Sequence, residues 1–183
     1  SILATAALGA SLGGADVVKQ VTAPMIVAGI GTVLSVVGML MVRCRNDNAT
    51  QKELLRSLLT GTLGSSVLIL LALVGLHFMG FISWGIFGSV VAGLVSGVVI
   101  GQATEYYTSD DYAPTRGIAG QAVMGPATAI IDGLATGMYS SGVPVLTICV
   151  GILCAFGFAG GFTDFTAGLY GIGFAAVGML STL

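Results

Sequence analysis

The sequence contains 183 residues, of which 55% are apolar and only 8% are charged, and its mean hydropathy is +1.01. A soluble globular domain of this composition would expose too much apolar surface, whereas proteins with several membrane-spanning helices commonly have it. The net charge of -2 does not identify a partner, and no basic run suggests nucleic acid, so we expect no nucleic-acid partner. We therefore predict an all-α, polytopic transmembrane helix bundle embedded in a lipid bilayer.

About 20 consecutive apolar residues suffice for a helix to cross the hydrocarbon core. Applied in chain order, this criterion divides residues 1–183 into about six helices or part-helices, which form a single transmembrane region. The chain begins without methionine and stops inside an apolar helix pattern, so we expect an internal piece of a larger protein, with its first and last segments truncated. The predicted segments are 2–15, 24–42, 57–78, 84–106, 122–158 and 165–183. Pro24 is expected to open the second segment, since a helix tolerates proline in its first turn, and Asp16 and Lys19 are expected in the short loop before it.

Basic residues are distributed unevenly between the predicted loops. The loop 43–56 carries Arg43, Arg45, Lys52 and Arg56, and the loop 107–117 carries Arg116. Both loops lie on one side of the membrane if the two spans between them cross. The opposite side has only Lys19. Because Lys and Arg are enriched in cytoplasmic loops, we expect the loops 43–56 and 107–117 to be cytoplasmic.

The segment 84–106 carries the most informative pattern. Glycines occur at positions 93, 97 and 101, and the next step of four residues reaches Glu105. Glycines at this spacing allow a neighbouring helix to approach closely, so this face is expected to point into the bundle. A carboxylate directed there is typical of an ion or proton path. Alternatively, Glu105 is an interfacial residue whose carboxylate reaches the headgroup water.

The stretch 117–160 permits two interpretations. It is either one long span broken near 140–144, ahead of Pro144, or a re-entrant piece followed by a short span. It also contains Asp132 in an otherwise apolar run. This acid is a second candidate for ion translocation, or else a residue of a loop or helix break. Asp164 is expected to cap the last helix.

Three stretches of the sequence are similar to a known family. Thr104-Glu-Tyr-Tyr-Thr-Ser109, followed by Tyr112-x-Pro114, resembles a segment of the membrane-integral pyrophosphatases, which are ion pumps driven by pyrophosphate. The stretches Gly125–Gly137 and Tyr170–Thr182 resemble the next two helices of that family in order and spacing. The resemblance covers essentially the whole chain.

The resemblance implies a pump of roughly sixteen helices that works as a homodimer, hydrolyses inorganic pyrophosphate with Mg²⁺, and moves protons or sodium ions. It also implies K⁺ or Na⁺ as a possible activator. Glu105 matches a family residue connected with ion translocation, and Thr104, Tyr106 and Tyr107 match supporting positions of the motif. Asp132 falls where a small or apolar residue is expected.

The family's pyrophosphate and magnesium ligands lie in aspartate-rich repeats that this chain does not contain. The resemblance therefore assigns no catalytic and no metal-binding residue here, and the chain alone is expected to be inactive.

Two further interpretations of the sequence remain open. A secondary transporter or channel with glycine-broken helices would also place small residues and acids at membrane depth. A purely structural membrane segment would tolerate replacement of Glu105. Only the Thr104–Ser109 resemblance separates the pump from the transporter at this stage.

Overall fold

The computed structural model describes residues 1–13, 16–42 and 51–181, and within these ranges the regular structure is entirely helical. The all-α prediction is therefore confirmed. Residues 43–50, in the predicted loop 43–56, lie outside the described residues. The helices are α1 (Ile2–Leu12), α2 (Val17–Met41), α3 (Gln51–Phe78), α4 (Trp84–Thr108), α5 (Ala113–Ala122), α6 (Pro126–Phe158) and α7 (Phe165–Leu180).

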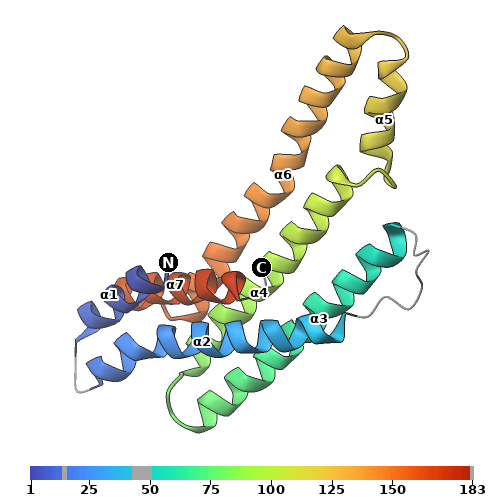
Figure 1. Ribbon diagram of the computed structural model, residues 1–183. Coiled ribbons are helices and arrows are strands. Elements are labelled where there is room, and N and C mark those ends of the chain that lie inside the picture. Colours follow the sequence, from blue (N-terminus) through green and yellow to red (C-terminus); the bar gives the residue numbers. More distant parts are fainter. Residues whose placement is uncertain (14–15, 43–50, 182–183) are drawn as a thin grey trace.

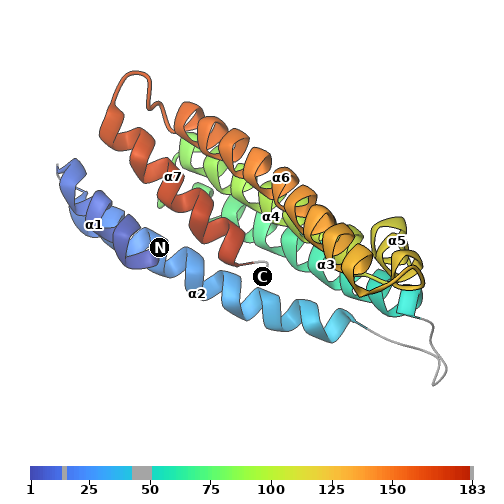
Figure 2. The ribbon, with the colours of Figure 1, turned by 90° about the horizontal axis from the view of Figure 1, so that it is seen from above.

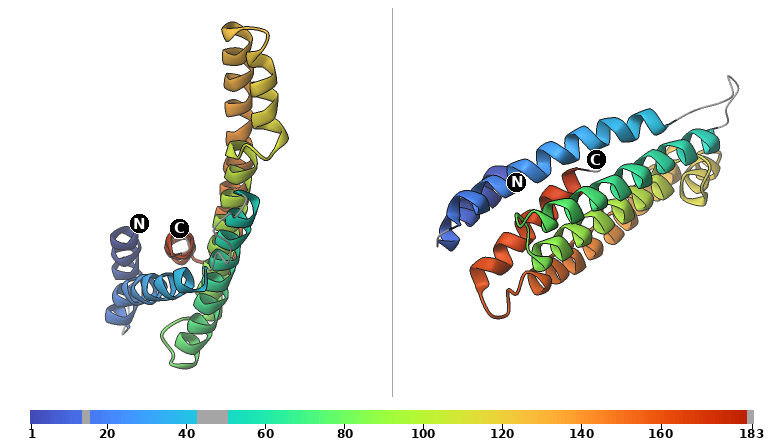
Figure 3. Two further views of the ribbon diagram at one scale, coloured as in Figure 1. Left: turned by 45° about the vertical axis from the view of Figure 1, so that its right-hand side comes forward. Right: turned by 90° about the horizontal axis from the view of Figure 1, so that it is seen from below.

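Among the described helices, α2, α3, α4 and α6 are long and apolar enough to cross a membrane. Helix α6 has 33 residues, which at 1.5 Å per residue corresponds to about 50 Å. This length exceeds the hydrocarbon core of about 30 Å. Figure 3 shows that α5 and the first half of α6 extend beyond the end of α4. If α4 crosses a bilayer, the N-terminal part of α6 therefore extends beyond the hydrocarbon core on that side.

Helix α4 occupies the centre of the bundle. It packs along α6 and α7, with α3 on another side (Figure 1). Viewed from above, α7 lies between the α1–α2 pair and the α4–α6 pair (Figure 2). These contacts place the C-terminal end of α4 between the start of α3 and the α5–α6 hairpin.

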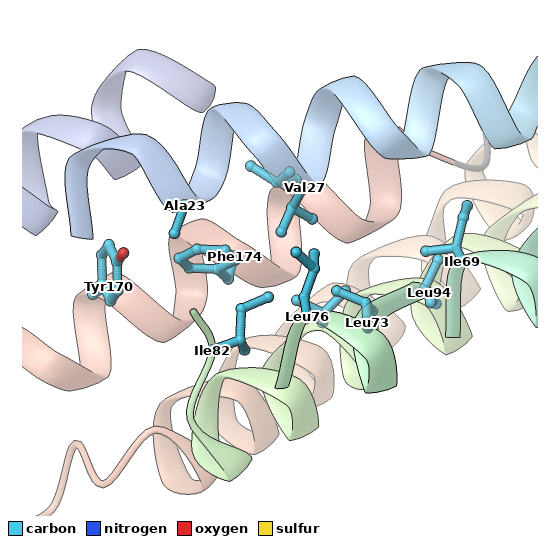
Figure 4. Packing of buried hydrophobic residues seen from close by; sticks show 11 residues of the cluster. Ala23, Val27, Ile69, Leu73, Leu76, Ile82, Leu94, Tyr170 and Phe174 are labelled. Carbon is cyan, nitrogen blue, oxygen red and sulfur yellow. The ribbon is translucent and has the colours of Figure 1, made fainter. Parts of the chain in front are cut away.

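The apolar core lies where α2, α3, α4 and α7 meet. Phe174 of α7 is fully buried there and lies among side chains of α2 and α3 (Figure 4). Burial on this scale requires close helix approach, and small residues provide it: a side chain at Gly178 would meet Val90 of α4 at 2.8 Å. The other core residues shown are Ala23, Val27, Ile69, Leu73, Leu76, Ile82, Leu94 and Tyr170.

Pro24 was predicted to open a helix. In the structure it lies inside α2 instead. A proline has no backbone N–H, so the Gln20 carbonyl, four residues earlier, loses its usual helical donor. The hydroxyl of Tyr170 donates a hydrogen bond to this carbonyl instead, at 2.6 Å. The tertiary contact from α7 thus satisfies the group that Pro24 leaves unpaired in α2.

The break predicted near 140–144 is absent, because α6 runs continuously through Pro144. Surrounding hydroxyls bond within the helix: Ser140 donates to the Gly137 carbonyl and Ser141 to the Met138 carbonyl, both at 2.8 Å. A helix in an apolar environment keeps its remaining backbone hydrogen bonds, since no water replaces them there.

The predicted loop 107–117 is also shorter than expected. Helix α4 continues to Thr108, and α5 begins at Ala113, close to Pro114 in its first turn. Proline is favoured in a first turn because its fixed φ suits the helix and its missing N–H is not needed there. At the other end of α5, the Thr128 hydroxyl donates to the Gln121 carbonyl at 2.9 Å. Most of the second half of the predicted loop therefore belongs to helix α5, and only residues 109–112 lie between α4 and α5.

Candidate ion-coupling site at the end of helix α4

Helix α4 begins at a capped end and packs tightly along its first half. The Ser83 hydroxyl accepts a hydrogen bond from the Ile86 N–H at 3.4 Å. The buried Ser89 hydroxyl donates to the Ala155 carbonyl of α6 at 2.9 Å, which ties the two helices together. This half of α4 is therefore fixed against α6.

The glycine face of α4 points into the bundle at its first two positions. A Cβ atom at Gly93 would clash with the backbone of Ala175 in α7, so the missing side chain permits close approach of the two helices. Gly97 is buried as well. At Gly101, in contrast, a Cβ atom would meet nothing within 4 Å. The face opens before it reaches Glu105.

Glu105 is half-buried and lines a cavity of about 300 Å³ between α3 and α4. Gln102 lies one turn earlier on the same helix face, and Thr62 lines the cavity from α3. The remaining lining residues are Leu58, Leu59, Leu63, Gly97, Val98 and Gly101. The structure therefore places an acid, an amide and a hydroxyl around one cavity with otherwise apolar walls.

The Thr104–Ser109 motif forms the last turns of α4. The hydroxyl of Thr104 donates to the Ile100 carbonyl at 2.9 Å, and that of Thr108 donates to the Thr104 carbonyl at 2.5 Å. The ring of Tyr106 lies 5.2 Å from the rings of both Tyr107 and Tyr112, measured between centroids. The motif residues thus make local and aromatic contacts that hold the end of α4.

The corner between α4 and α5 is held by contacts from α5. Arg116 donates from Nε to the Asp110 carbonyl at 3.0 Å and places its guanidinium 3.6 Å from the Asp111 carboxylate. The hydroxyl of Thr115 donates to the Tyr107 carbonyl at 3.4 Å. The direction in which α5 leaves α4 is therefore fixed by two side chains of α5, which contact the short loop and the last turn of α4.

Asp132 lies away from Glu105. Its carboxylate faces α5, where a Cβ atom at Gly117 would lie 3.7 Å from it. The antiparallel pairing of Ser89 with Ala155 places Glu105 level with about residue 140 of α6. Asp132 is then roughly 12 Å further along, at 1.5 Å per residue. The two acids therefore do not share a site in this part of the protein.

Comparison with known proteins connects this architecture to a family. The whole chain, residues 1–183, matches the family described as "Inorganic H+ pyrophosphatase". The chain belongs to the inorganic H+ pyrophosphatase family. Membership, together with the four long apolar helices, confirms the prediction of a multi-pass membrane protein.

Relatives within the inorganic H+ pyrophosphatase family carry two kinds of name. The chain is 50% identical, over its full length, to the "Putative K(+)-stimulated pyrophosphate-energized sodium pump" of Bacteroides thetaiotaomicron. It is 38% identical, over 86% of its length, to the "K(+)-stimulated pyrophosphate-energized sodium pump" of Thermotoga maritima. It is 32% identical, over 90% of its length, to the "K(+)-insensitive pyrophosphate-energized proton pump 2" of Moorella thermoacetica. These matches cover 26%, 22% and 24% of the relatives, so the chain spans about a quarter of their length.

The magnesium that we expect for an inorganic H+ pyrophosphatase requires several oxygen ligands that converge on one point. In residues 1–13, 16–42 and 51–181, no three His, Cys, Asp or Glu side chains lie together. Asp110 is exposed, while Asp111 pairs with Arg116. The described residues therefore do not fit a magnesium site, and they support no chemical step at that metal.

Glu105 was proposed from the sequence, whereas its two polar neighbours in the cavity were not. Gln102 could have been found, because residues three apart share a helix face. Thr62 carried no such signal. It lies on another helix, and only the packing of α3 against α4 brings it to the cavity.

Proposed function

We propose that the chain acts within a longer membrane protein that couples hydrolysis of cytoplasmic inorganic pyrophosphate to transport of sodium ions or protons. The match of all 183 residues to the inorganic H+ pyrophosphatase family carries this proposal. It also favours the pump over a secondary transporter or channel. By analogy with relatives four times as long, the other parts of the pump would supply the pyrophosphate and magnesium sites.

Within that pump, the proposed role of this chain is to form part of the helix scaffold and of the ion path. Glu105 is the proposed coupling residue, supported by its position in a cavity between two long apolar helices. Thr104, Tyr106 and Tyr107 would hold the helix end that carries it. Asp132 is a weaker candidate because it lies on α6 opposite α5, away from this cavity. The chain alone would be inactive.

Sodium is the cation that we propose for transport, with K⁺ as activator. The support comes from sequence identity: three relatives named as K(+)-stimulated sodium pumps are 50%, 43% and 38% identical to the chain, and two named as K(+)-insensitive proton pumps are 36% and 32% identical. A homodimer with residues 43–56 and 107–117 on the cytoplasmic side completes the proposed arrangement.

The test uses the full-length protein in sealed vesicles with magnesium and pyrophosphate. Hydrolysis, sodium uptake and acidification are recorded together, with and without K⁺. Pyrophosphate-dependent sodium uptake that K⁺ increases is the expected result. Uptake of protons alone would refute the choice of sodium. A folded protein that hydrolyses no pyrophosphate would refute the pump itself.

The role of Glu105 is tested in the same vesicles. Glu105→Ala should reduce ion uptake more than hydrolysis, because the residue lies in the proposed ion path and the described residues contain no cluster of acids that could hold the magnesium needed for hydrolysis. The matched control is Glu53→Ala, which removes an exposed acid from the first turn of α3. Wild-type uptake and hydrolysis in Glu105→Ala would contradict the coupling role.

A further inference from the structure

The cavity between α3 and α4 is lined by a few polar side chains and by apolar walls. Its polar side chains are those of Glu105, Gln102 and Thr62, and its apolar walls come mainly from leucines of α3. Its volume of about 300 Å³ is enough for several water molecules, each of which occupies about 30 Å³ in the liquid. The cavity is therefore large enough for a cation with part of its hydration shell.

The carboxylate of Glu105 has no cationic partner in the described part of the chain. The two described ion pairs join Lys19 to Asp16 and Arg116 to Asp111. An unpaired carboxylate between apolar helices is expensive to keep ionised unless it is hydrated or neutralised by a cation. A single negative charge is balanced by one positive charge, whereas a divalent ion would leave an excess charge against the leucines.

The other two polar groups add neutral oxygen donors to this charge. The Thr62 hydroxyl already donates its hydrogen to the Leu58 carbonyl at 3.1 Å, so its oxygen is left to accept or to coordinate. The Gln102 amide supplies a carbonyl oxygen of the kind that binds alkali and other hard cations. Gly101 adds no side chain that would fill the space.

From this arrangement we propose that the cavity is a binding site for a monovalent cation, coordinated by Glu105, Gln102 and Thr62. The proposal rests on the proposed pump function and identifies where on this chain the cation binds. The cation is held as an ion pair with one carboxylate and by two neutral oxygen atoms, and the remaining ligands are water.

Cation binding is tested on the purified full-length protein by chemical protection, without pyrophosphate. Dicyclohexylcarbodiimide adds the protonated carboxyl group across one of its C=N bonds. The acyl group then migrates to nitrogen to give a stable N-acylurea, and no atom is lost. Because the reagent needs the protonated acid and sodium needs the ionised acid, bound sodium should slow the modification of Glu105. Mass spectrometry of the peptide containing Glu105 follows the rate in sodium chloride and in choline chloride of equal ionic strength.

Two variants and one control identify the ligands. Thr62→Val and Gln102→Leu each remove one oxygen donor, and the sodium concentration that protects Glu105 should rise about tenfold or more. This follows because a polar contact to a charged group contributes about 1.5–3 kcal/mol. Thr32→Val is the matched control, since its hydroxyl makes an equivalent bond to the Ala28 carbonyl on α2 at 2.9 Å. Its protecting concentration should not change.

The outcomes separate this inference from the pump function. Protection by sodium but not by choline, weakened in Thr62→Val, supports the site. Modification of Glu105 at the same rate in both salts overturns it, even if the same preparation hydrolyses pyrophosphate and takes up sodium. Complete lack of modification also overturns it, because an accessible cavity must admit the reagent.

Discussion

The contribution of the hydrogen bond between Tyr170 and the Gln20 carbonyl to the free energy of unfolding can be predicted. At 2.6 Å it joins α7 to α2, and Pro24 has removed the donor that this carbonyl would otherwise use. Tyr170→Phe retains the buried ring, whose centroid lies 4.9 Å from that of Phe174, and deletes only the donor. Leaving a partly buried carbonyl unpaired should cost about 1–3 kcal/mol.

A double-mutant cycle distinguishes this explanation from a general packing effect. Pro24→Ala returns a backbone N–H to α2, so the Gln20 carbonyl regains a donor within its own helix. Tyr170→Phe should then cost about 1 kcal/mol less than it does in the wild type, since contacting residues couple by about 0.5–3 kcal/mol. Tyr139→Phe on α6, where the side chain is 75% exposed, is the matched control and should be neutral.

The assay for this cycle is thermal unfolding of the detergent-solubilised full-length protein. The fraction that still elutes as a folded species in gel filtration is measured after heating. A lower midpoint for Tyr170→Phe, recovered in part by Pro24→Ala, is the expected pattern. An equal loss on both backgrounds would show that the Gln20 carbonyl does not depend on Tyr170.

Three further predictions, two of them with a control substitution, can be tested in the same assay. Gly93→Ala places a methyl group against the α7 backbone, which should destabilise the fold by about 1–3 kcal/mol. A gain of about 0.5–1 kcal/mol in helix propensity offsets part of this loss. The control Gly101→Ala has open space for its methyl group and should be neutral or slightly stabilising. Ser89→Ala removes the hydrogen bond from α4 to α6 and should cost about 0.6–1.7 kcal/mol; Ser96→Ala, whose hydroxyl bonds within α4, should cost less. Pro144→Ala should leave α6 equally stable or more so, and a lower midpoint would show that the helix needs its proline.

Much of the fold could be predicted because helices in lipid depend on local sequence. Hydropathy identified the long helices, and Asp164 caps α7 as predicted, its carboxylate accepting from the Thr166 N–H at 3.0 Å. The start of α2 was missed because Asp16 and Lys19 indicated a loop. Their side chains instead form a 3.0 Å ion pair on the first turn of the helix. A charged pair at a helix end is compatible with a span whose ends reach water.

The proline positions show where local rules fail. Pro24 and Pro144 were interpreted as a helix start and a helix break, and both lie inside continuous helices. In water, a proline in a helix interior costs about 3 kcal/mol. At Pro24 the missing bond is replaced by Tyr170, which is 150 residues away in sequence from Gln20. No pattern along the chain reveals such a compensation before the helices are packed.

The candidate site was predictable only from one side. The spacing of four residues from Gly93 to Glu105 indicated a face that enters the bundle, and the structure bears this out at Gly93 and Gly97 but not at Gly101, where the face is open. The opposing surface is formed by α3, whose Thr62 follows no recognisable motif. The acid of a site can thus be found from one helix, while its neutral partners are known only after the helices are assembled.

The glycine face of α4 divides into two parts with different physical roles. Gly93 lies against the backbone of α7, and the nearby Ser89 bonds to α6, so this half of α4 cannot separate from either helix without losing close contacts. Gly101 faces open space beside the cavity that Glu105 and α3 share. The cavity therefore lies beyond the part of α4 that close contacts fix against α6 and α7.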